Sequence, residues 1–207
     1  MREIAAHIVD GFYEDPERIR DIALSLSFTP KHGAMYPGGE AFSSSIDWMP
    51  YRSEIISLIG RHSEVPRNGK NFEQGKFRLA LKQDESTRPD GVHQDVQKYS
   101  GIVYLSKNEN CSGGVGLYRC VHTQETSITR KWLDYITEKY HVTHTHPDFK
   151  SVLQRHMKDW SNWEQFGELP MRYNRLIILM AHCFHASKGI FGYTPETGRL
   201  TQHFEIY

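Results

Sequence analysis

Short segments with alternating apolar residues, rather than long helical repeats, dominate this chain from residue 71 onward. Residues 71–81, 99–105 and 115–119 show the period of two that is typical of β-strands. An apolar run at 174–180 and a last alternating segment at 199–207 continue the series. So many short strands predict a β-sandwich or barrel core instead of an alternating βαβ sheet.

Helical patterns precede these strands and return in one later insertion. Residues 16–26 place apolar side chains on one face after an Asp-Pro start, and residues 51–60 repeat isoleucine at helical spacing. Two more helical patches, at 127–139 and 147–166, are rich in aromatic residues. We expect these helices to support the strands from outside.

The length of the chain, 207 residues, predicts one domain over residues 1–207. Its N-terminal helical support is expected over about residues 1–70, with a strand at 3–9 and a long loop at 29–45. A helical insert is expected over about residues 121–170. We therefore predict a mainly β fold with helical buttressing.

Charge and composition exclude several classes of partner. The 25 Lys and Arg residues balance 25 Asp and Glu residues, so no net field attracts the chain to nucleic acid or to an anionic membrane. The apolar run LIILMA at 176–181 is far shorter than the roughly 20 residues of a membrane span. Three cysteines without a CxxC pair suit a reducing compartment, and we expect a cytoplasmic protein.

Histidine is unusually frequent, with 12 copies, and one pair has a spacing that suits a metal site. His93 and Asp95 lie in the segment GVHQD, on a strand predicted at 92–96. Side chains at i and i+2 of a strand point to the same face. Imidazole and carboxylate groups are both metal ligands. One strand end can thus supply two ligands.

A third ligand is expected from the segment MAHCFHAS, which offers His182 and His185. Two histidines and one carboxylate leave about half of an octahedral coordination shell open, as in non-haem Fe(II) oxygenases. An acidic cosubstrate that chelates the metal would need a fixed cation at the far wall of the pocket. Arg199, at the start of the last strand, can bind the distal carboxylate of such a cosubstrate with its planar guanidinium. Thr201 faces the same side and adds a hydroxyl.

Five segments in order resemble the Fe(II)- and 2-oxoglutarate-dependent dioxygenase superfamily, close to its prolyl-hydroxylase-like branches. They cover roughly residues 72–207 and read His93-x-Asp95, YSGIVYLS, SGGVGLYR, YNRLIIL with FHAS and FG, and GRLTQHF. The resemblance implies a double-stranded β-helix of the jelly-roll or cupin-like kind, with the metal at one open end. It implies three metal ligands and two residues beside the cosubstrate: His93, Asp95 and His185, and Arg199 with Thr201.

The family pattern places its last ligand directly before Ala186-Ser187, which selects His185 over His182. The resemblance also implies Fe(II), 2-oxoglutarate and dioxygen as cofactor and cosubstrates. It predicts a hydroxylase that releases succinate and CO2 and acts on an amino-acid-like small molecule or on a peptide or protein side chain. No nucleic-acid or membrane partner is expected.

Two other classes of function stay open. A cupin-like metalloenzyme that does not use 2-oxoglutarate would share the ligands but would not need Arg199. A non-catalytic β-sandwich that binds another protein would need no metal. A second histidine cluster, at His141, His144 and His146, lies in the insert. We interpret it as solvated loop histidines, because no thiolate or HExxH helix accompanies it.

Overall fold

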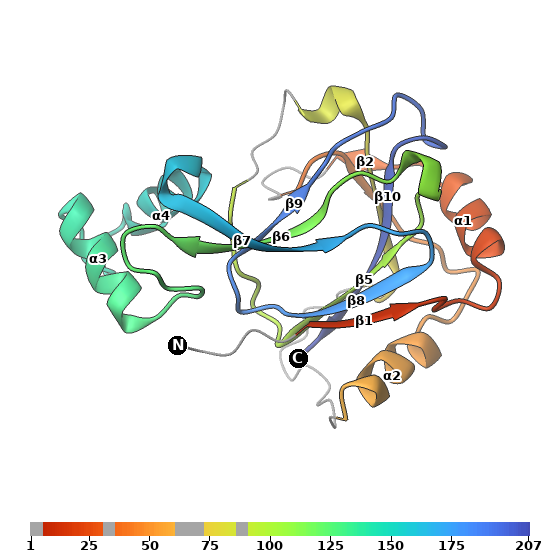
Figure 1. Ribbon diagram of the computed structural model, residues 1–207, viewed down its shortest axis with the longest axis horizontal. Coiled ribbons are helices and arrows are strands. Elements are labelled where there is room, and N and C mark those ends of the chain that lie inside the picture. The colour runs from red at the N-terminus through yellow and green to blue at the C-terminus, as the bar shows by residue number, and fades with distance from the viewer. Residues whose placement is uncertain (1–5, 31–35, 61–72, 86–90) are drawn as a thin grey trace.

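Two antiparallel β-sheets form the centre of the computed structural model, which describes residues 6–30, 36–60, 73–85 and 91–207 (Figure 1). Among these residues the larger sheet orders its strands β1-β8-β5-β10-β4-β3-β2, and the smaller sheet orders them β7-β6-β9. The strands are β1 (Ala6–Asp10), β2 (Thr29–Pro30), β3 (Gly39–Ala41), β4 (Lys76–Ala80), β5 (Tyr99–Tyr104), β6 (Gly114–Cys120), β7 (Trp163–Pro170), β8 (Arg175–Met180), β9 (His185–Lys188) and β10 (Arg199–Ile206). The fold is therefore mainly β, as the sequence predicts.

Helices accompany the sheets at the N-terminal side and in the insert. Those in the described part of the chain are α1 (Pro16–Leu24), α2 (Met49–Leu58), α3 (Arg130–Tyr140) and α4 (Phe149–Lys158), with the short 3-10 helices η1 (Lys82–Glu85), η2 (Asn108–Asn110) and η3 (Trp160–Asn162). Helix α1 begins where the sequence predicts, because Pro16 suits its first turn and the Asp15 carboxylate accepts a hydrogen bond from the Arg18 N–H at 3.0 Å. No described helix has the length and apolar character needed to cross a membrane.

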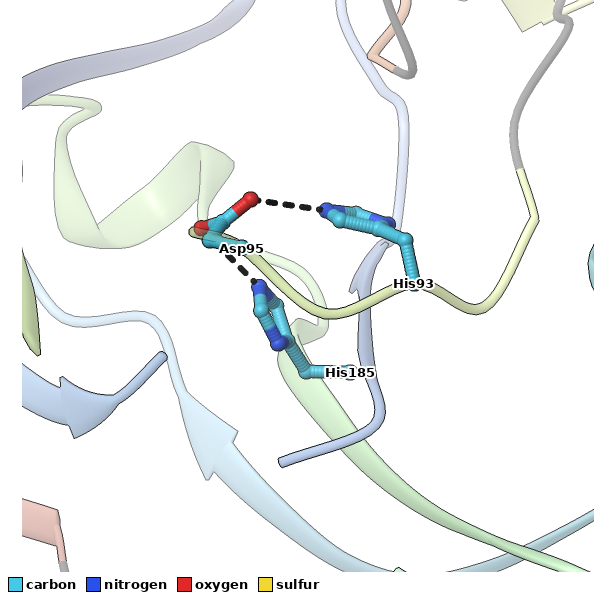
Figure 2. A group of neighbouring side chains, drawn as sticks. All are labelled: His93, Asp95 and His185. Carbon is cyan, nitrogen blue, oxygen red and sulfur yellow. Dashed lines mark ion pairs between the residues drawn. The ribbon is translucent and has the colours of Figure 1, made fainter. Parts of the chain in front are cut away.

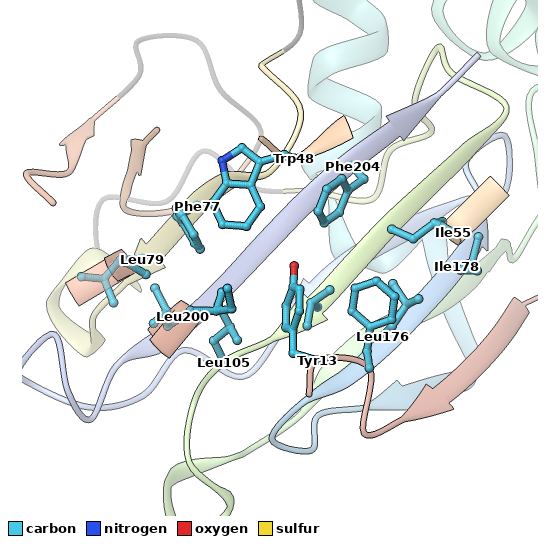
Figure 3. Close-up of a cluster of buried hydrophobic side chains, with 14 of the residues drawn as sticks. Tyr13, Trp48, Ile55, Phe77, Leu79, Leu105, Leu176, Ile178, Leu200 and Phe204 are labelled. Carbon is cyan, nitrogen blue, oxygen red and sulfur yellow. The ribbon is translucent and has the colours of Figure 1, made fainter. Parts of the chain in front are cut away.

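Strand alternation gives the larger sheet one apolar face. On β10, Leu200, Phe204 and Ile206 are buried on this side, because successive strand residues point to opposite faces of a sheet. Ile19 of α1 and Ile55 of α2 are buried in the same cluster, and Figure 3 shows Ile55 beside Phe204 and Ile178. Each such side chain contributes about 1.5–3 kcal/mol when it leaves water. We call this side the outer face.

The opposite side of the larger sheet, which we call the inner face, is partly polar. Ile102 of β5 and Val115 of β6 belong to one apolar cluster, so this face packs against the smaller sheet. On β10, however, the inner face carries polar and charged groups: Arg199, Thr201, His203 and Glu205. Groups of this kind need hydrogen-bonding partners when they are buried. The inner face is therefore where a functional cavity is expected.

Most of the strand predictions are confirmed. The segments 99–105, 115–119, 174–180 and 199–207 correspond to β5, β6, β8 and β10. The first residues of the strands predicted at 3–9 and 71–81 lie outside the described residues. The rest of the first segment belongs to β1, which continues to Asp10, and the rest of the second contains β4. Within the loop predicted at 29–45, residues 31–35 lie outside the described residues. The remaining residues contain β2 and β3, because β3 pairs with both β2 and β4.

Two predictions are wrong. The helix predicted at 147–166 ends at Lys158, because the Asp159 carboxylate accepts a hydrogen bond from the Ser161 N–H and begins η3 instead. Trp163 then starts β7, which pairs with β6. The strand predicted at 92–96 forms only an isolated bridge, between His93 and His185.

An aromatic cluster holds the helical insert onto the smaller sheet. Trp132 of α3 and Trp163 of β7 are buried together with Phe184, which precedes β9. His156 of α4 is fully buried among them, with ring centroids 5.6 Å from both Trp132 and Trp163. Its Nδ1 lies 3.1 Å from the Tyr140 hydroxyl oxygen. Burial, followed by the positive charge of Lys139, lowers the pKa of His156 to about 4.

We predict that His156 makes the fold sensitive to acid. The folded protein holds this imidazole neutral, whereas the unfolded chain protonates it below about pH 6.5, so stability falls as the pH falls from about 6.5 to 4. The free energy of unfolding can be measured with urea at about pH 7.5 and at about pH 5.0. Its decrease between these two pH values should be smaller in His156→Gln than in the wild type, by up to about 2 kcal/mol. An equal loss in both proteins would contradict this assignment.

Candidate metal centre

Main-chain hydrogen bonds bring the two halves of the predicted site together. The His93 N–H donates to the His185 carbonyl at 2.9 Å, and the His185 N–H donates back to the His93 carbonyl at 2.8 Å. The Asp95 N–H donates to the Ala181 carbonyl at 2.8 Å. His93 and Asp95 therefore lie beside His185 even though segment 92–96 is not a full strand.

The side chains of His93, Asp95 and His185, which we call the triad, converge on one point (Figure 2). Nε2 of His93 lies 3.8 Å from Oδ1 of Asp95, and Nε2 of His185 lies 3.5 Å from Oδ2. The potential ligand atoms all lie within 4.8 Å of one another. Two imidazoles and one carboxylate at this spacing suit a divalent transition-metal ion, with part of its coordination shell left open.

Each imidazole is oriented through its other nitrogen. Nδ1 of His93 donates to the Gly91 carbonyl at 3.1 Å, and Nδ1 of His185 donates to the Cys183 carbonyl at 2.8 Å. A proton on Nδ1 leaves Nε2 as the nitrogen that can bind a metal. Metal-binding histidines commonly donate their second N–H to a backbone carbonyl in this way. The donor set therefore fits a metal ion in detail.

The carboxylate of Asp95 is held by two neighbours. Ser100 of β5 donates its hydroxyl to Oδ2 at 3.1 Å, and the Gln97 side-chain amide donates to the same oxygen at 3.0 Å. Gln97 also donates to the Ser100 hydroxyl oxygen at 2.7 Å. These bonds fix one carboxylate oxygen and leave Oδ1 facing His93.

Proximity and burial shift all three pKa values of the triad. Burial, followed by repulsion from His185, lowers the pKa of His93 to about 4. Burial alone would lower the pKa of His185, but its interaction with Asp95 outweighs this effect and raises that pKa to about 10. Burial alone would raise the pKa of Asp95, but the two histidines hold it well below its ordinary value. Protonated His185 therefore balances the charge of the Asp95 carboxylate, and a metal ion bound by the triad would replace the proton on Nε2 of His185.

A cavity of about 280 Å³ opens over the triad between the two sheets. Its walls include all three triad residues, Phe204 and Glu205 of β10, and Gln94 and Gln97. The last two lie in segment 91–97, which also contains His93 and Asp95 and which we call the triad segment. A smaller compartment of about 30 Å³ adjoins it and is lined by Arg199 and Thr201. The two compartments share six lining residues: Tyr36, Arg78, Ile102, Val115, Ser187 and His203.

Arg199 thus lies in the compartment next to the triad, not in the triad's own compartment. Its guanidinium donates to the carbonyls of Lys188 and Gly114, each at 2.9 Å. These partners hold the group in place without neutralising its charge. Thr201 faces the same compartment, with its hydroxyl oxygen 2.9 Å from Nε2 of His203.

The structure separates the two candidate histidines after β8. His185 joins the triad, whereas His182 is exposed and its Nε2 lies 3.5 Å from the Val96 carbonyl. The second histidine cluster, His141, His144 and His146, is exposed and forms no ligand group among the described residues.

Sequence reasoning missed several polar residues of the cavity, among them Gln97, Ser100, Arg78 and His203. A signal was present for some of them. Ser100, Arg78 and His203 are polar residues inside otherwise apolar strands, at positions that alternate away from the core. Gln97 lies in a loop and gives no such signal.

Ser100→Ala is predicted to weaken divalent-metal binding about tenfold, because it removes one of the two donors that hold Oδ2 of Asp95. Isothermal titration with Mn²⁺ measures the affinity. Ser187→Ala is the matched control, since Ser187 lines the same cavity without a hydrogen bond to Asp95. Equal affinities in the two variants would show that Ser100 does not position the carboxylate.

Gly91→Ala is predicted to displace the triad segment. A Cβ at residue 91 would lie 2.4 Å from the Met157 carbonyl oxygen and 2.8 Å from Cα of Lys158. The backbone that orients His93 must then move, so metal affinity should fall at least tenfold and thermal stability should drop. Gly167→Ala is the control, because its Cβ would meet only ordinary contacts with Leu117. Wild-type metal binding by Gly91→Ala would refute this role.

Comparisons with known proteins indicate a family rather than an activity. No curated protein matches the chain. Among solved structures, the chain is similar to the selenomethionine-labelled Fe(II)/(alpha)ketoglutarate-dependent dioxygenase TqaL, with 12% sequence identity and a TM-score of 0.38 over 97% of this chain and 80% of that chain. Similarity at this level is too low to assign a function. A family model matches residues 2–206, and the chain therefore belongs to DUF6445, a family of unknown function.

Proposed function

We propose that the protein is an Fe(II)- and 2-oxoglutarate-dependent dioxygenase, with the triad as its metal ligands. The observation that carries this proposal is the orientation of the two imidazoles. Both donate through Nδ1 to backbone carbonyls and turn Nε2 toward the same carboxylate. This donor set is the 2-His-1-carboxylate arrangement of non-haem Fe(II) oxygenases. We infer further that the two sheets form a double-stranded β-helix, with the triad at one end.

The smaller compartment supports 2-oxoglutarate as cosubstrate. Its lining residues Arg199 and Thr201 offer a guanidinium and a hydroxyl next to the triad's compartment. A guanidinium can bind the distal carboxylate of a dicarboxylic acid in two parallel hydrogen bonds. Because the two compartments adjoin, the other end of that acid would then extend past their shared lining residues toward the triad.

When bound, Fe(II) and 2-oxoglutarate supply the oxidation of a C–H bond by dioxygen, with release of succinate and CO2. The residues of the chain position the reactants. Ser100 and Gln97 fix the Asp95 carboxylate, and Arg199 orients the cosubstrate. Ile102 and Val115 line both compartments, and their apolar side chains limit the access of water there.

We propose that the substrate is an amino-acid-like small molecule or the side chain of a peptide or protein, and that it is hydroxylated. The cavity over the triad supports a polar ligand of modest size, because its volume is about 280 Å³ and Gln94, Gln97 and Glu205 line it.

The test is an anaerobic titration of the Fe(II)-loaded protein with 2-oxoglutarate, followed by the visible absorption band that bidentate chelation of Fe(II) produces. We expect a saturable band in the wild type and none in Asp95→Ala. Arg199→Lys should raise the dissociation constant about tenfold or more, since it removes bidentate binding of a charged group. Arg175→Lys is the matched control, because Arg175 pairs with Asp10 and does not line the cavity.

Either of two results would contradict this function. A metal-loaded protein without the band would favour a cupin-like metalloenzyme that does not use 2-oxoglutarate. A protein that binds no divalent metal, with His93→Ala behaving like the wild type, would favour a non-catalytic binding protein.

A further inference from the structure

A second guanidinium lies in the cavity and has no part in the function proposed above. Arg78 is on the inner face of β4, where it pairs in register with Thr201 of β10. It lines both compartments, and 26% of its side chain is exposed. A buried or half-buried arginine in a concave site commonly serves to bind an anion.

The side chain of Arg78 is held from two sides. Its Nε donates to Oε1 of Glu40 on β3 at 3.2 Å. Cζ of the guanidinium lies over the face of the Tyr36 ring, 3.9 Å from the ring centroid. Glu40 also accepts a hydrogen bond from Lys76 at 3.2 Å, so its negative charge is shared between two cations. Arg78 is therefore positioned before any ligand binds.

The way in which Arg78 is held decides which of its edges can bind a ligand. The bond to Glu40 uses the edge that contains Nε. The two terminal amino groups form another edge, which can donate two parallel hydrogen bonds to one carboxylate. The hydrogen bond to Glu40 uses one of the five N–H donors of the guanidinium, so donors remain for a ligand.

Arg78 is also the arginine that shares a compartment with the triad. Arg199 lines only the smaller compartment, whereas Arg78 lines the larger one together with His93, Asp95 and His185. Burial is the main reason for the lowered pKa of His203, which lines the same compartment, and the positive charge of Arg78 lowers it further.

We propose that Arg78 binds a carboxylate of the substrate, so that the enzyme acts on a small carboxylic acid. This inference rests on the proposed function and extends it to the class of substrate. Arg199 and Thr201 are left for the distal carboxylate of the cosubstrate. A substrate held at Arg78 lies in the compartment of the triad, where its oxidation would take place.

The experiment uses the Nε–Hε NMR signal of Arg78 as a reporter in the wild-type protein. The hydrogen bond to Glu40 protects this proton from exchange, and loss of the signal in Arg78→Lys assigns it. The ¹⁵N-labelled protein is loaded with Zn²⁺, a diamagnetic substitute for Fe(II), and saturated with 2-oxoglutarate. Sodium acetate is then titrated into one sample, and acetamide, its neutral counterpart, into another.

We expect acetate to shift the Arg78 signal in a saturable way, several-fold more than acetamide does, while 2-oxoglutarate alone shifts the signal of Arg199. A response of Arg78 to neither acetate nor 2-oxoglutarate would overturn the inference. A shift with 2-oxoglutarate that abolishes the response to acetate would also overturn it, since Arg78 would then serve the cosubstrate.

The failure of the proposed function would look different. In that case neither arginine signal would respond to 2-oxoglutarate, and calorimetry of the Zn²⁺-loaded protein would show no binding. Acetate titrated into the Zn²⁺-loaded protein without 2-oxoglutarate then tests Arg78 by itself, and a saturable shift would still show a carboxylate site there.

Discussion

The paired main-chain hydrogen bonds between His93 and His185 are the constraint on which the site depends. They join a segment before β5 to a strand that is almost a hundred residues away in sequence, and they set the distance between the two imidazoles through the backbone. The orientation of each ring is then fixed as well, because its Nδ1 donates a hydrogen bond to the carbonyl of the residue two positions before it. Asp95 lies in the same segment, whose N–H groups donate to carbonyls in two distant parts of the chain: Met157 in α4, and Ala181 and His185 after β8.

The predictable part of the fold is the part in which local pattern and burial agree. Strands β5 and β8 place apolar side chains alternately in two clusters, one on each face, whereas β10 alternates apolar residues of the outer cluster with polar residues. The sequence period of two in these strands therefore follows directly from their position in the larger sheet. Strand β7 is different. Its residues Glu164, Gln165 and Phe166 are all exposed, so β7 has little apolar alternation, and its pairing with β6 makes it a strand.

The candidate site shows the same division. His93, Asp95 and His185 could be selected from the sequence because spacing on a strand places two groups on one side and a known family order suggests the third. The bridge itself could not be predicted, because it depends on the close approach of Gly91 to the end of α4. Gln97 and Tyr36 come from loops, where sequence spacing carries no information on direction. Only the three-dimensional arrangement shows that these residues meet at one cavity.

The inner face of the larger sheet is the place where the sequence departs most from the needs of packing. A sheet covered by a second sheet is stabilised best by apolar side chains, yet β10 and β4 place two arginines, a histidine and a glutamate there. Burying such groups costs free energy unless partners offset it. Arg199 donates hydrogen bonds to backbone carbonyls, and Arg78 pairs with Glu40 and lies over the Tyr36 ring. These partners offset part of the cost of burying the two charges and hold both side chains in place. Local rules broken in this way mark functional sites. The charged inner face and the triad line two adjoining compartments that share six residues. Under the function that we propose, the cost of burying these charges is offset by their use in binding anionic ligands.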